Sequence, residues 1–275
     1  MVQGNQVRGA AIAAIAMTFI APPLMAQGAQ PAQADAVRTR VLAWPAGDRL
    51  YVATNADVRY VPGQAAKMVI TGPSSAIQDI VVEHGVIERR HAGWHWRWWG
   101  SWDWGDWRPS RRVQIVVTAP HVERAGVSGS GHLDLGRLVQ DRLEASVSGS
   151  GALDVSGQFK SLGLGVSGSG GGRLNQVSAT DMSASISGSG WIRAAGAATS
   201  LHLSISGSGH ADLGGLVAEN VSANLSGSGS ARLSPKRAAD LAVAGSGSIR
   251  LLTEPAHLST HRAGSGSIIS PGGVS

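Results

Sequence analysis

The sequence predicts an all-β fold, a parallel β-helix (β-solenoid) with about 19–20 residues per coil and a Trp-rich loop. The first observation is the motif Ser-Gly-Ser-Gly (SGSG), which recurs six times in the second half of the chain at steps of 19 or 20 residues. The second is that residues around each copy alternate between apolar and polar, a period of two that is typical of strands with one buried face. The third is the abundance of Gly and Ser, which disfavour helix interiors.

The six copies of the motif set the length of a coil. In residues 143–155, every second residue from Leu143 is apolar or glycine, and those between are small, polar or charged. One coil cannot bury its apolar face alone, so successive coils must stack, with parallel strands about 4.8 Å apart. The copies begin at Ser128, Ser148, Ser167, Ser187, Ser206 and Ser226, with weaker copies at Ala244 and Ala263.

The SGSG motif itself predicts a pinched or bent place in each coil. Its two glycines share the parity of the buried residues, where no side chain would fit, and glycine also tolerates a positive φ. Its two serines face outward and align between coils as serine ladders. A corner inside the motif would allow the facing to invert, and the sequence leaves this open.

Residues 1–34 predict a signal peptide. Arg8 precedes an apolar run over residues 10–21, which is too short to span a bilayer comfortably, and two prolines follow it. Cleavage is expected after Ala34, with Ala26 as an earlier alternative. An uncleaved membrane anchor is the other interpretation. The chain has no cysteine, which excludes a lipoprotein anchor, disulfides and zinc-thiolate sites. We expect export to the periplasm or cell surface.

Residues 35–120 lack the motif but contain short runs rich in Val, Ile and Tyr, separated by turn residues. They predict irregular opening coils or a small β-cap, continuous with the SGSG-repeat solenoid of residues 121–275. At the other end the pattern decays. Arg262 stands where Val147 stands in its own coil, and Pro271 follows, as expected of a terminal coil that blocks edge-to-edge growth.

A Trp-rich loop over residues 94–107 reads WHWRWWGSWDWGDW. Trp suits sugar faces, membrane interfaces and protein hot spots, so the loop is a candidate binding surface. The alternatives are a loop that folds back over an open end or side of the solenoid, and a disordered loop. The candidate ligand-binding residues are Trp94, Trp96, Trp98, Trp99, Trp102, Trp104 and Trp107.

One outward column of the solenoid is charged. Asp134 and Asp154 would lie about 5 Å apart in adjacent coils, close enough to act as acid and nucleophile or to bind calcium. A solvated face on which Asp and Arg neighbours offset one another is the favoured interpretation. The column reads Asp134, Asp154, Arg173, Arg193, Asp212, Arg232 and Arg250.

The sequence gives little support for nucleic-acid binding or for a metal site. The net charge of +5 is spread along the chain, which argues against nucleic acid as a partner. His91 and His95, with Asp103 and Asp106, lack the tight spacing of metal ligands. No catalytic residues, cofactor or metal are predicted.

The repeat contains the coils VSGSGHLDL, VSGSGALDV, ISGSGHADL and LSGSGSARL, and it follows an opening that reads LYVATNADVRYVPG. Together these sequences resemble the bacterial head-GIN family. That family is a domain of unknown function labelled "putative auto-transporter adhesin", and the resemblance covers roughly residue 41 to the C-terminus. It implies a right-handed β-helix, an exported protein and no established activity, with no catalytic residues to carry over.

These observations predict a non-enzymatic cell-envelope protein with a binding, adhesion-type or structural role. The expected partners are a glycan or another envelope protein, with no more than peripheral membrane contact and an open oligomeric state. The alternative is a polysaccharide-active lyase or hydrolase that uses the outward carboxylates of the solenoid.

Overall fold

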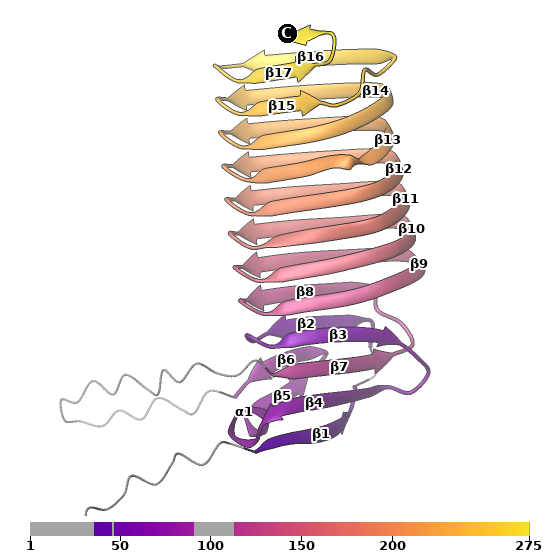
Figure 1. The fold of residues 1–275 in the computed structure, drawn as a ribbon, viewed down its shortest axis with the longest axis vertical. Coiled ribbons are helices and arrows are strands. Elements are labelled where there is room, and N and C mark those ends of the chain that lie inside the picture. Colours follow the sequence, from indigo (N-terminus) through magenta and orange to yellow (C-terminus); the bar gives the residue numbers. More distant parts are fainter. Residues whose placement is uncertain (1–35, 46, 91–112, 275) are drawn as a thin grey trace, which may run out of the picture. The chain divides into compact units, whose positions relative to one another are not determined.

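A computed structural model describes residues 36–45, 47–90 and 113–274, and it confirms the all-β solenoid (Figure 1). Each long strand of the repeat forms most of one coil and pairs in parallel with the next. The predicted signal peptide, residues 1–34, lies outside the described residues. The strands of the repeat are β8 (Arg124–Gly129), β9 (His132–Gly149), β10 (Ala152–Gly168), β11 (Gly171–Gly188), β12 (Trp191–Gly207), β13 (His210–Gly227) and β14 (Ser230–Gly245).

Each coil has two outer faces, which β10 illustrates. We call the outer surface formed by the residues after an SGSG motif face A (residues 152–156 in β10), and that formed by the residues before the next motif face B (residues 161–167). Between them the chain bends at Gly157, where φ is +129° and the register with β11 shifts. Inward side chains such as Leu153 and Leu164 are buried on both sides, so stacking joins them into one core.

The corner falls inside the SGSG motif without inverting the buried parity. The second glycine, for example Gly151, is buried, as expected. The first glycine is different from our expectation, because Gly149 lies at the exposed apex of the bend with φ of +104°. A Cβ on Gly149 would lie 2.8 Å from the carbonyl oxygen of Gly129, one coil earlier. The apex glycine is therefore required by the backbone conformation and by its neighbour's carbonyl, not by a crowded interior.

Both serines of the motif are exposed in the coils from Ser128 to Ser228. The coils are joined at this edge by backbone hydrogen bonds: the Ser150 N–H donates to the Gly129 carbonyl at 2.9 Å, and the Ala152 N–H donates to the Gly131 carbonyl at 3.0 Å. The serine ladders therefore lie on the outside of a continuous ladder of backbone hydrogen bonds.

The described residues between 36 and 119 close the lower end of the solenoid in Figure 1 with strands of mixed direction. β2 (Arg49–Ala53) and β3 (Asp57–Pro62) form one coil, parallel to β8 and β9 above and to β6 (Val86–Arg89) and β7 (Gln114–Ala119) below. Antiparallel strands then end both faces. On one face β4 (Lys67–Pro73) pairs with β7 and then with β1 (Val37–Ala43), and on the other face β5 (Ile80–Glu83) pairs with β6. The short helix α1 (Ser74–Gln78) lies between β4 and β5 in the chain.

The C-terminal end also stops the parallel stack. β15 (Ser248–Leu251) and β17 (Ser267–Ser270) extend face A, β16 (His257–Ala263) extends face B, and β18 (Gly273–Val274) pairs antiparallel to β17. Arg262 is in register with Val243, as its place in the repeat predicts, but unlike the buried residues of that column it is exposed. Thus the inward column that is apolar in earlier coils ends in a charge.

Candidate functional site

All seven candidate tryptophans lie in the segment 91–112, outside the described residues, so their role stays a prediction. The points where this segment leaves and rejoins the fold are described. The Asp57 N–H donates to the Val113 carbonyl at 2.9 Å, and the His132 N–H donates to the Ala56 carbonyl at 3.0 Å. Val113, Ala56 and the buried Gly131 therefore occupy one column, and the Trp-rich segment is inserted at the corner that later coils fill with SGSG.

The charged column lies on face A with the predicted register, and Arg59 extends it below Asp134. Asp134 does not face Asp154 as a free acid pair. Its Oδ2 lies 3.8 Å from Nε of Arg59, and its Oδ1 accepts a hydrogen bond from the Gly136 N–H at 2.8 Å. The sequence reading missed Arg59, because no SGSG motif marks its coil.

Asp154 is held in the same way by cationic or polar neighbours. Its Oδ2 lies 3.4 Å from Nε2 of His132, and its Oδ1 lies 3.7 Å from Nη1 of Arg173. Farther along, Asp212 lies 3.9 Å from Arg232. The acids of the column are therefore each offset by a basic neighbour, as the favoured interpretation of the sequence expects, although like charges also stand in register at Asp134 with Asp154 and at Arg173 with Arg193.

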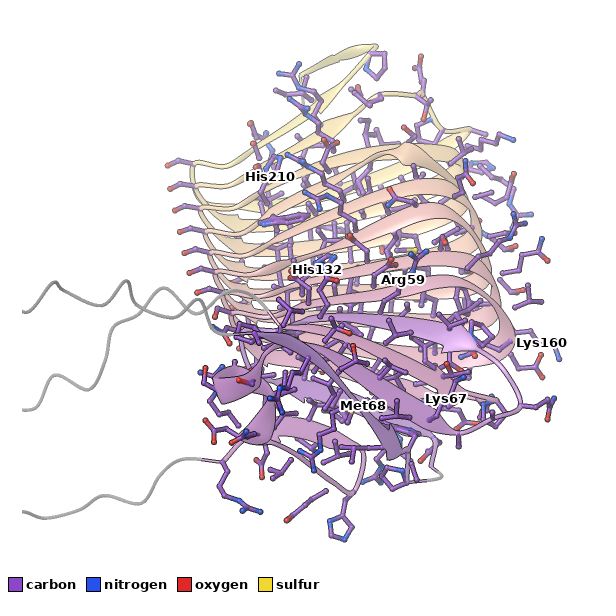
Figure 2. The ribbon with its side chains drawn as sticks, turned by 60° about the horizontal axis from the view of Figure 1, so that its bottom comes forward. Arg59, Lys67, Met68, His132, Lys160 and His210 are labelled. Carbon is purple, nitrogen blue, oxygen red and sulfur yellow. The ribbon has the colours of Figure 1, made fainter. Side chains whose placement is uncertain are left out.

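The histidines give no metal site in the described part of the chain, where no cluster of three or more His, Asp or Glu side chains could hold an ion. His132 and His210 share one outward position on face A, and Figure 2 shows them at different heights of the stack. His210 is hydrogen-bonded through Nδ1 to the hydroxyl of Ser230. His91 and His95, which the sequence does not favour as metal ligands, lie outside the described residues.

Face B carries a shallow groove of about 590 Å³ that the sequence reading did not anticipate. Small outward residues such as Ser183 and Gly165 line much of it, and Tyr51 and Arg124 lie at its N-terminal end. The Tyr51 ring lies against Gly126, where a Cβ would come within 2.7 Å of two ring carbons. The sequence does carry one sign of this groove, because glycine replaces larger residues at some outward positions of the repeat.

Arg124 is fixed by an ion pair at this end of the groove. Its Nη2 lies 2.7 Å from Oδ2 of Asp48, and this hydrogen bond lowers the pKa of the Asp48 carboxyl below its ordinary value of 3.8. Arg49 lies farther away, with its Nε 3.9 Å from Oδ1 of Asp48, and it lowers the Asp48 pKa less. The pair anchors β2 to β8 across the coil boundary.

We expect Arg124→Gln to raise the pKa of Asp48 towards its ordinary value, and Arg49→Gln to raise it much less. Because the folded-state pKa lies below the unfolded-state value, the pair stabilises the fold above the unfolded pKa, and this contribution is lost as pH falls through the folded pKa. Carboxyl carbon chemical shifts followed by NMR against pH measure the change. Equal pKa values for Asp48 in the two variants would contradict the assignment of Arg124 as its main partner.

Among the described residues, no helix is both long and apolar enough to traverse a bilayer.

Comparison with known families gives one match that covers most of the chain. The model described as "Putative auto-transporter adhesin, head GIN domain" matches residues 48–255. The match begins just before β2 and ends after β15, so it includes the opening coils as well as the SGSG repeat. None of the curated proteins compared with the chain is a significant match.

Solved structures share the fold at low sequence identity. A "Putative lipid binding protein" from Parabacteroides distasonis ATCC 8503 superposes with a TM-score of 0.76 and 21% identity, over 85% of this chain and 96% of that one. A "putative adhesin" from Parabacteroides merdae ATCC 43184 gives 0.72 and 18%, over 85% and 95% of the two chains. A second "putative adhesin" from P. distasonis ATCC 8503 gives 0.73 and 19%, over 86% and 97%. These likenesses establish the fold alone.

Proposed function

The chain belongs to the head GIN domain family, and on that premise we propose that it is an exported cell-envelope protein that binds or adheres and does not catalyse a reaction. The observation that carries this proposal is the state of the charged column. Asp134 and Asp154, the residues an enzyme would need, are each engaged by neighbouring basic side chains. An acid and a nucleophile that act as a pair must both face one substrate, whereas each of these carboxylates is held by its own set of neighbours.

Export is supported by the sequence of residues 1–34. A basic n-region, a short apolar run and a small-residue cleavage site are the three parts of a secretory signal peptide. The absence of cysteine from the chain agrees with a fold that needs no disulfides outside the cytoplasm. We place the mature protein in the periplasm or at the cell surface, with no more than peripheral membrane contact.

The proposed binding residues are the seven tryptophans of residues 94–107. Tryptophan carries a large apolar surface with one hydrogen-bond donor and is enriched in binding hot spots. The position of residues 90 and 113 at a corner of the coil supports this role, because an insertion at a corner leaves the parallel ladders of both faces unbroken. The proposed ligand is a glycan or another envelope protein.

Replacement of all seven tryptophans by serine is the direct test. Because hot-spot residues contribute about 2 kcal/mol or more each, we expect the affinity for the ligand to fall by roughly 30-fold or more. A glycan array followed by titration calorimetry with the best oligosaccharide measures it. The matched control is the double variant Asp134→Asn and Asp154→Asn, which leaves the Trp-rich segment intact and is expected to bind a neutral oligosaccharide as the parent does.

Two results would contradict the proposal. Release of saccharide product that disappears in the Asp134→Asn and Asp154→Asn variant would identify an enzyme. The second result would be that an aqueous quencher barely reduces the tryptophan fluorescence of the parent protein and that binding survives the serine replacement. It would identify the segment as a cover over the solenoid.

A further inference from the structure

Trp191 breaks the pattern of face A. It is the first residue of β12 and stands in register with Gly171 in the coil before and His210 in the coil after. The same position is Ala152, Ser230 or another small residue in most coils. Unlike the core residue Trp44, Trp191 points outward and is only half-buried. A large aromatic side chain on an otherwise small and polar face requires an explanation.

The indole of Trp191 lies against the backbone of the neighbouring coil. A Cβ on Gly171 would overlap the Cδ2 and Cε2 atoms of the ring, so glycine at this position makes the space for the indole. Two guanidiniums pack on the ring, with Cζ of Arg173 at 5.0 Å and Cζ of Arg193 at 5.4 Å from its centroid. Cation–π contacts of this length hold both cations beside one aromatic surface.

The two arginines form a local excess of positive charge. Arg173 and Arg193 are in direct register on adjacent strands, where like charges are unfavourable. Arg173 has Asp154 at 3.7 Å. Arg193 is in register with Asp212, but that carboxylate lies 3.9 Å from Arg232 instead, and in the described residues Arg193 has no ion pair of its own. One cation above the indole is therefore not balanced by an acid.

We propose that Arg173, Trp191 and Arg193 form a binding site for an acidic sugar unit of a glycan. The guanidiniums take a carboxylate or sulfate group through charge-assisted hydrogen bonds, and the indole holds the two guanidiniums side by side while its exposed part lies beside the sugar ring. Asp154 and Asp212 lie on either side in the same column and repel further anions, which limits the site to about one acidic unit. The site lies on different residues from the Trp-rich segment and goes beyond the proposed function.

The test measures binding of an oligogalacturonate to the purified protein by titration calorimetry at low salt, with a neutral galactose oligomer of equal length beside it. Loss of one charge-assisted pair predicts that Arg193→Gln weakens binding of the acidic oligomer by about tenfold or more. The matched control is Arg250→Gln, which removes the same charge from the same column away from the indole, and it should leave the Kd nearly unchanged. Gly171→Ala keeps every charge but displaces the indole, and it should also weaken binding.

The site is also expected to lose affinity in 0.5 M NaCl, since salt screens exposed charges. Equal effects of Arg193→Gln and Arg250→Gln would overturn the proposal and indicate a diffuse attraction to net charge. Equal binding of the neutral oligomer would also overturn it, as would a preference for anionic phospholipid vesicles over the oligogalacturonate. Loss of acidic-oligomer binding in the seven-Trp variant but not in Arg193→Gln would assign the ligand to the Trp-rich segment and reject this site.

Discussion

Val166→Arg is expected to remove most or all of the cooperative stability of the solenoid. Val166 is 2% exposed and lies in the inward column with Val147 and Ile186, in the middle of the stack. An arginine there would bury a charge that no carboxylate in the core can pair, at a cost of several kcal/mol for one ion. That cost is a large fraction of the roughly 5–15 kcal/mol by which a whole protein is stable.

The comparison for this experiment is Val139→Arg. Val139 is a strand residue of β9 with 73% of its surface exposed, and the same chemical change there is expected to alter stability by no more than about 0.5 kcal/mol. Urea unfolding followed by circular dichroism at the strand band measures both variants. Similar urea midpoints would show that the inward column is not a sealed core. Arg262 stands in this same column in the parent chain, where the last coil leaves it exposed.

The second large effect is expected from Gly157→Ala, at the bend between faces A and B. Gly157 has φ of +129°, and a Cβ there would overlap the carbonyl group of Leu138 in the coil before. A side chain in such a backbone conformation costs about 1–3 kcal/mol, and forced repacking costs about as much again. We expect a loss of about 3 kcal/mol or more, seen as a lower urea midpoint.

Gly165→Ala in the same strand is the matched control. Gly165 has ordinary strand φ, and the nearest atom to an added Cβ is the Ser185 hydroxyl at 3.5 Å. Alanine there reduces the entropy of the unfolded chain, so a small gain of about 0.5 kcal/mol is expected. If both glycine variants unfolded at the same midpoint, the bend at Gly157 would not depend on the left-handed conformation.

The repeat was predictable because its signal is local. A fixed step of 19 or 20 residues and a period of two together identify the strands, the buried columns and the charged column, and Arg262 marks the terminal coil. The apex role of Gly149 was not predictable from parity alone. Parity assigns a side to a residue in a strand, whereas the residue at the apex of a bend belongs to neither side.

The ends and the candidate sites were less accessible to sequence reasoning. The antiparallel pairing of β1 with β4 joins residues 37 and 73, and no local pattern encodes a partner at that distance. Arg59 joins the charged column only through the pairing of β3 with β9. The register of Trp191 with Gly171 follows from the repeat, but the contact of its indole with Gly171 and Arg173 depends on side-chain packing, which the sequence alone does not give.

The two antiparallel ends are built independently of the number of coils between them, and each interior coil touches only its immediate neighbours. Duplication or deletion of one 19- or 20-residue segment would therefore change the length of the solenoid by one strand spacing, about 4.8 Å, while the strands at both ends kept their partners. The length of the solenoid can therefore change in evolution one coil at a time, separately from the residues that bind a ligand.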